Sequence, residues 1–184
     1  MIALLIFIGI VLVLAVWLVA IYNSLVKNRN MVKEGWSGIE VQLKRRANLI
    51  LNLLETVKGY MGHERGVLEK VTELRAQSMG TQNVGERAKL EGALSRSLAN
   101  LFAVAEGYPD LKANQNFLDL QGQLSQLEEQ IQMARRYYNG TVRDYNTQVE
   151  SFPSNLVANF FGFKQAEFFE ITDEADRAVP KVSF

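Results

Sequence analysis

A regular apolar pattern begins in the stretch Trp36-Ser37-Gly38-Ile39-Glu40-Val41-Gln42-Leu43-Lys44-Arg45-Arg46. Apolar or aromatic residues recur from Trp36 in alternating steps of three and four as far as Leu74, and only Arg46 and Glu64 interrupt them. Such a seam, sustained over several heptads, is typical of a helix that packs lengthwise on other helices. It predicts one long amphipathic helix from about residue 30 to about residue 77.

Three glycines lie inside this predicted helix, at positions 59, 62 and 66. Each weakens a helix by roughly 1 kcal/mol relative to alanine. They indicate either a bend or a close contact with another helix.

An apolar run precedes the seam, because residues 2–22 contain no charged or strongly polar side chain. A helix needs roughly 20 such residues to span a bilayer. Trp17 and Tyr22 lie toward the end of the run, where aromatic side chains favour the headgroup region. The alternative is a cleaved signal peptide, but a basic N-terminal region and a small-x-small cleavage motif are missing. We therefore expect residues 1–25 to be an uncleaved anchor.

Basic residues follow the apolar run closely, at Lys27, Arg29 and Lys33. Positive charges are retained on the cytoplasmic side of a membrane. The sequence therefore predicts an outside N-terminus and a cytoplasmic domain, although the same residues also suit a soluble helix surface.

Further helices are predicted at about 86–106 and 116–150, with a short one at 154–161. Residues 78–85 have the composition of a loop, and Gly107-Tyr108-Pro109 ends the helix before it because glycine suits a C-cap and proline stops continuation. The predicted fold class is all-α: a transmembrane helix followed by an antiparallel bundle of three long helices and a short fourth. The bundle domain would occupy residues 26–161 and an aromatic-rich tail residues 162–184.

Residue types needed for catalysis or metal binding are scarce. The chain has one histidine, His63, and no cysteine, so neither a zinc site nor a Cys–His or Ser–His centre is expected. Basic and acidic residues balance at 20 each, whereas nucleic-acid binding needs an electropositive surface. We predict no catalytic, cofactor or metal site, no enzymatic activity and no nucleic-acid partner.

Two groups of residues are candidates for contacts with a partner. Arg46 falls on the apolar seam, which predicts an acidic partner on another helix of the same chain or of a neighbour, whereas Lys44 and Arg45 fit a solvated face better than a lipid-binding patch. The tail phenylalanines have two interpretations: they cap the bundle, or they form a contact surface. The tail candidates are Phe161, Phe163, Phe168 and Phe169.

Helix lengths predict self-association. A first soluble helix of about 45 residues measures ~70 Å, and a second of about 20 measures only ~30 Å. The loop that follows spans at most ~30 Å when extended. The seam at Trp36, Ile39 and Leu43 would then lack a partner within the chain, unless the first helix bends or the third helix reaches down to cover it. A neighbouring protomer is the simplest cover, so a homo-oligomer is expected.

Several blocks of this chain resemble the LemA family. They are Val41-Gln42-Leu43-Lys44-Arg45-Arg46, Glu55-Thr56-Val57-Lys58-Gly59-Tyr60, Glu106-Gly107-Tyr108-Pro109-Asp110-Leu111, Ala134-Arg135-Arg136-Tyr137-Tyr138-Asn139 and Ser151-Phe152-Pro153-Ser154-Asn155. The family often has a proline where this chain has Leu51, so a kink there is less expected. The resemblance implies a bacterial protein anchored in the plasma (inner) membrane, and it implies no activity.

Two function classes remain open at this point. The first is a self-associating structural or scaffolding protein at the inner face of the membrane. The second is a membrane-anchored adaptor that binds a membrane protease or a signalling receptor. The bilayer is the expected partner in both.

Overall fold

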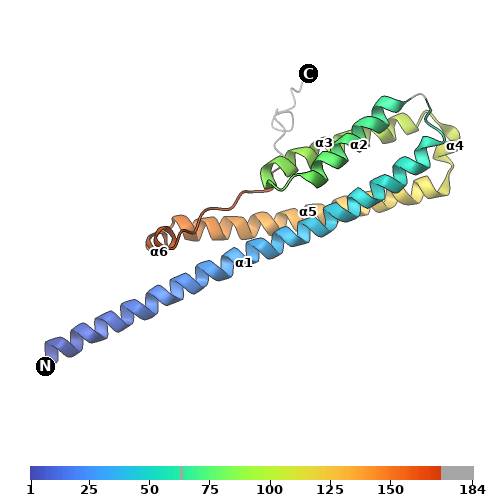
Figure 1. The fold of residues 1–184 in the computed structure, drawn as a ribbon. Helices are drawn as coiled ribbons and strands as arrows, with labels where there is room; N and C mark the ends of the chain where they lie inside the picture. The colour runs from blue at the N-terminus through green and yellow to red at the C-terminus, as the bar shows by residue number, and fades with distance from the viewer. Residues whose placement is uncertain (63, 171–184) are drawn as a thin grey trace, which may run out of the picture. The chain divides into compact units, whose positions relative to one another are not determined.

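The computed structural model describes residues 1–62 and 64–170, and this part of the chain is built from helices without strands. The helices are α1 (Ile2–Lys58), α2 (Arg65–Gly80), α3 (Val84–Ala105), α4 (Pro109–Lys112), α5 (Gln115–Glu150) and α6 (Ser154–Phe160) (Figure 1). The predicted all-α class, with a long apolar N-terminal helix, is confirmed.

The first soluble helix is shorter than the sequence predicts. It ends at Lys58, not near residue 77, and α2 begins as a separate helix at Arg65. The amides of Tyr60 and Met61 both donate to the carbonyl of Val57, at 3.0 Å each, and close the turn that ends α1. Gly59 and Gly62 lie in this break, so the glycines mark a chain reversal. His63 lies outside the described residues.

The remaining boundaries agree closely with the prediction. The Asn83 side chain accepts from the Glu86 amide at 2.7 Å and caps α3, so the loop before it is only residues 81–83. Asn114 accepts from the Phe117 amide at 3.1 Å in the same way at the start of α5. The short α4 between them was not predicted, although Pro109 suits its first turn.

By its internal contacts the described chain divides into two compact units. The first unit contains residues 1–38 and 134–167, and the second contains residues 39–133 and 168–170 of the described chain. This division does not test the predicted domain limits after residues 25 and 161, which stay a prediction.

In the first unit, α1 and α5 run antiparallel. The Gln148 amide donates to Ser24 Oγ and accepts from the Asn28 amide, both at 2.7 Å. Nearer the other end, the Trp36 ring lies 5.6 Å from the ring of Tyr138. Gly35 permits this approach, because a Cβ there would lie 3.2 Å from the Tyr138 Cα.

The chain after α6 returns along this helix pair. Gly162 has a φ of 72°, which favours glycine, and the turn delivers Phe163 into a buried position. The Asn146 side chain then forms two hydrogen bonds with the backbone of Ala166. Its oxygen accepts from the Ala166 amide at 2.8 Å, and its nitrogen donates to the Ala166 carbonyl at 2.9 Å. The Tyr138 hydroxyl donates to the Glu167 carbonyl at 2.7 Å. Burial, with the Glu167 charge nearby, raises the pKa of Tyr138 to about 12, so the hydroxyl stays a donor at neutral pH.

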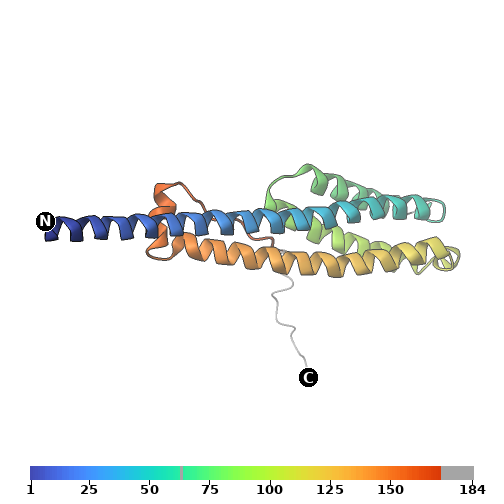
Figure 2. The same cartoon turned by 90° about the horizontal axis from the view of Figure 1, so that it is seen from below.

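The second unit has an apolar core between α1, α2, α3 and α5. The helices α2 and α3 lie side by side as a hairpin in both views (Figures 1 and 2). The seam residues of α1 meet those of α2 and α3 in one cluster, which includes Ile50, Leu53, Val57, Val71, Leu74, Leu94, Leu98, Leu101 and Phe117. Burial of such a cluster is the main source of stability in a helical domain.

Candidate functional site

The polar centre of the second unit is Arg46, which is buried on the core face of α1. Its guanidinium forms ion pairs with Glu91 on α3 at 3.1 Å and with Glu128 on α5 at 3.2 Å. It also donates to Ser95 Oγ at 2.7 Å. The predicted acidic partner of Arg46 is therefore confirmed, and it comes from within the chain.

Glu91 is the most enclosed acidic member of this cluster, with a side-chain exposure of 5% against 36% for Glu128. Its other carboxylate oxygen accepts from the Ser78 hydroxyl on α2. The cluster thus joins α1, α2, α3 and α5. A buried charge is tolerated only when it is paired and hydrogen-bonded, so these side chains depend on one another.

A groove of about 690 Å³ opens beside the Arg46 cluster, between α3 and α5. Arg46, Glu128, Ser95 and Ser125 form its polar side. The remainder of the lining is largely apolar, and it consists of Leu98, Ala99, Phe102, Leu118, Gln121, Gly122 and Leu124. Leu118 is 43% exposed at its edge, so the groove offers an apolar surface with a polar end.

The polar side chains of the groove are one arginine, two serines, a glutamine and a glutamate. Its arginine is already engaged by two carboxylates, and its hydroxyl groups have no histidine beside them. Within residues 1–62 and 64–170, no three histidine or acidic side chains are placed to hold a metal ion. What the groove can do is bind an apolar surface and orient it by hydrogen bonds.

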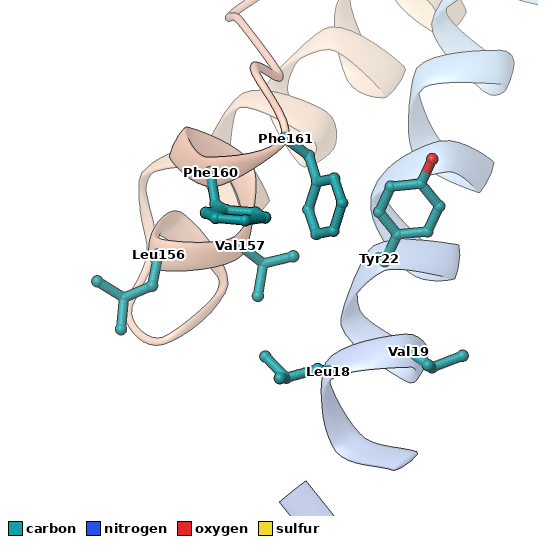
Figure 3. A pocket seen from close by; sticks show the side chains of 7 residues that line it. All are labelled: Leu18, Val19, Tyr22, Leu156, Val157, Phe160 and Phe161. Atoms are coloured by element: carbon teal, nitrogen blue, oxygen red, sulfur yellow. The ribbon is translucent and has the colours of Figure 1, made fainter. Parts of the chain in front are cut away.

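The first unit has a second, strongly apolar groove, where α6 faces α1 (Figure 3). It measures about 490 Å³ and is lined by Leu18, Val19, Tyr22, Leu156, Val157, Phe160 and Phe161. The Tyr22 ring lies 4.8 Å from that of Phe161 and 5.7 Å from that of Phe163. The Arg29 guanidinium lies over the Phe163 ring at 5.0 Å. The aromatic spacing of α6 is visible in the sequence, but its placement against Tyr22 is not.

The apolar N-terminal part of α1 fits a membrane anchor. Among the described residues, α1 is the helix that is long and apolar enough to cross a membrane, and none of its apolar window is buried. A core helix of a soluble protein would be covered, whereas residues 2–20 are exposed throughout. The predicted flanking residues Trp17, Tyr22, Lys27, Arg29 and Lys33 are also exposed.

The predicted contact residues on the seam occupy interior positions. Ile39 and Leu43 are fully buried, and Trp36 is half-buried against Tyr138. The expectation that this part of the seam lacks cover within the chain is therefore wrong. It assumed one uninterrupted helix to residue 77, from whose far end the second helix returns only partway. Because α1 ends at Lys58, α5 runs back antiparallel to α1 in the first unit, where Tyr138 covers Trp36.

The tail phenylalanines divide into two buried and two exposed rings. Phe163 and Phe169 are buried, with 7% and 0% of their surface exposed. Phe161 and Phe168 are 56% and 37% exposed. The tail is thus partly structural, while Phe161 contributes to an open apolar surface.

Comparison with known proteins finds relatives that match most of this chain. The chain is 25% identical to Protein LemA of Metamycoplasma hominis over 153 residues, which covers 82% of this chain and 69% of that protein. It is also 25% identical to Magnetosome protein MamQ 2 of Paramagnetospirillum magneticum over 184 residues, with coverages of 86% and 68%. Magnetosome protein MamQ of Magnetospirillum gryphiswaldense is 22% identical over the same shares. The sequence profile of the LemA family matches residues 35–184, and with most of its length inside that match the chain belongs to the LemA family.

Proposed function

We propose that this protein is a non-catalytic, single-pass adaptor of the bacterial inner membrane, which binds a helical segment of a membrane-protein partner in the groove between α3 and α5. The span is the N-terminal part of α1, with the N-terminus outside and the domain that follows the span cytoplasmic. Lys27, Arg29 and Lys33 support this orientation, because positive charges are retained on the cytoplasmic side.

The observation that carries the proposal is the groove beside Arg46. It is open, its lining is largely apolar, and the Arg46 guanidinium at its polar end is already paired with two carboxylates of the protein. An amphipathic helix binds such a groove by placing its apolar stripe on the floor and its polar groups at the rim. Self-association, the alternative function, has less support, because the seam that called for a neighbouring protomer is covered within the chain.

The orientation is tested with a single cysteine at the exposed residue Ala99 of this cysteine-free chain. A thiol reagent that cannot cross membranes, added to intact cells, is expected to label Ala99→Cys only after the inner membrane is made permeable. Labelling before that step would place the units outside and contradict the proposed orientation.

The groove is tested by attaching a photoactivatable crosslinker to Ala99→Cys in membranes. We expect one adduct with an integral membrane protein, and a much weaker one from the neighbouring exposed residue in Asn100→Cys, which does not line the groove. Gly122→Phe should abolish the adduct, because Gly122 lines the groove and a Cβ there meets nothing within 4 Å, which leaves room for a bulky side chain to block the groove.

Two results would contradict this assignment. Equal adducts from Ala99→Cys and Asn100→Cys, or an adduct that survives Gly122→Phe, would show that the groove is not the binding site. An adduct of two 20.8 kDa chains would instead establish self-association and favour the scaffolding function.

A further inference from the structure

Large apolar side chains are exposed on α6 and in the turn before it. On α6, Leu156 is 61% exposed and Phe160 83%, and residues spaced four apart lie on the same face of a helix. In the turn, Phe152 is 80% exposed. Exposed apolar surface is unfavourable by roughly 25 cal/mol per Å², so a cluster of this kind marks a contact surface.

The place of α6 in the first unit indicates what covers this surface. Across the apolar groove, α6 faces Leu18, Val19 and Tyr22, which form the last turns of the proposed span (Figure 3). When residues 2–22 cross a bilayer, these turns lie where the hydrocarbon meets the headgroups. The exposed face of α6 is therefore beside the interfacial layer of the cytoplasmic leaflet.

Charges around α6 match the same location. Lys27 and Arg29 follow Tyr22 on α1, and Lys164 follows the turn after α6; all three side chains are exposed. Phenylalanine and leucine on one side with lysine and arginine nearby are typical of helices that lie in a membrane interface and contact anionic lipids. The groove itself is almost purely apolar in its lining, which suits a hydrocarbon chain.

We propose that α6 is a second membrane-contact element, in which Phe152, Leu156 and Phe160 insert into the cytoplasmic leaflet and a lipid acyl chain fills the groove between α6 and α1. This inference rests on the proposed membrane span. The protein would then contact the bilayer through two elements, the span and α6. The Tyr22 and Phe161 rings, 4.8 Å apart, close the groove on the headgroup side.

The inference is tested with the full chain in vesicles of phosphatidylcholine and phosphatidylglycerol. Single cysteines at Leu156, Phe160 and Asn159 carry an environment-sensitive fluorophore, and the lipids carry a quencher on the acyl chain near the headgroup. We expect blue-shifted emission and a marked loss of intensity for the labels at Leu156 and Phe160. The label at Asn159, an exposed polar neighbour on the same helix, should lose less.

Two further labels separate this inference from the proposed function. Leu12→Cys reports on the span, and quenchers deep in the acyl region should reach its label. Arg136→Cys is the solvent control, because this exposed residue on α5 lies near the level of Gly35, roughly 20 Å along α1 from Tyr22 at about 1.5 Å per residue.

The outcomes are distinct. If the Leu12 label is quenched while the Phe160 label resembles the Arg136 control, the anchor stands and the second contact is wrong. If the Leu12 label is also unquenched, the span itself fails, and the inference fails with it. If unlabelled Phe160→Cys forms a disulfide-linked dimer in the vesicles, and the label in the labelled sample is shielded from the lipid quencher, a second copy of the chain covers α6, and the lipid assignment is overturned.

Discussion

Arg46→Ala is expected to lower the free energy of unfolding by about 3–5 kcal/mol, the usual result of removing one partner from a buried ion pair. Glu91, which has a side-chain exposure of 5%, would stay buried without the guanidinium that lies 3.1 Å away. Glu128 is more exposed, at 36%, and water would solvate it, so Glu91 accounts for most of the loss. Chemical denaturation followed by far-ultraviolet circular dichroism measures the change.

The neighbouring residue provides the control for this prediction. Arg45 is exposed, and its hydrogen bonds to Gln42 and Gln130 are long, at 3.4 and 3.3 Å. Arg45→Ala should therefore cost less than about 1 kcal/mol. The double variant Arg46→Met with Glu91→Leu should recover much of the stability, because it removes both buried charges. Equal effects of the two arginine substitutions would mean that the Arg46 cluster is solvated.

Phe169→Ala is expected to destabilise the protein by about 3–5 kcal/mol, the range for truncating a buried phenylalanine. The ring is fully buried, and the residue belongs to the second compact unit although it follows the first unit in sequence. Its removal would leave a cavity in the core of the second unit. Thermal unfolding of the purified protein measures the effect.

Phe168→Ala is the matched control, since this ring is 37% exposed and the substitution should change stability much less. A purely interfacial tail would give the opposite pattern: neither substitution would alter the unfolding of the isolated protein, and both would weaken partner binding. The comparison therefore decides between the structural and the contact role of the tail.

Helix types and most boundaries follow from the sequence, because the 3–4 period and the capping residues are local signals. The end of α1 does not. Apolar residues continue in step across the turn, from Val57 on α1 to Val71 and Leu74 on α2, and both segments face one core. Periodicity alone therefore predicts one helix where the chain forms two, α1 and α2, with a reversal between them. The glycines at 59 and 62 are the local signal for that break. Whether they end the helix or only weaken it depends on the packing of the α2–α3 hairpin that follows them.

The candidate sites differ in how much of each can be predicted from the sequence. The register of Arg46 on the seam is enough to predict a buried charge and therefore an acidic partner. The choice of Glu91 and Glu128 depends on how α3 and α5 pack, which no local pattern specifies. The groove at α6 was missed for a similar reason: the spacing of Phe152, Leu156 and Phe160 is visible, but its position beside Leu18 and Tyr22 is set by the return of the chain after α5.

The helix α1 has no joint between its apolar end and the segment that α5 covers, since Ile2 through Gly38 is continuous helix within the first unit. A domain on a flexible linker tumbles over its anchor and loses that rotational freedom each time it binds. With the proposed span in the bilayer, the loss is incurred once for the first unit, when the helix enters the membrane, so later encounters start from a fixed orientation of that unit. Tilting of the span, for instance in a bilayer of different thickness, would be transmitted as a tilt of the first unit.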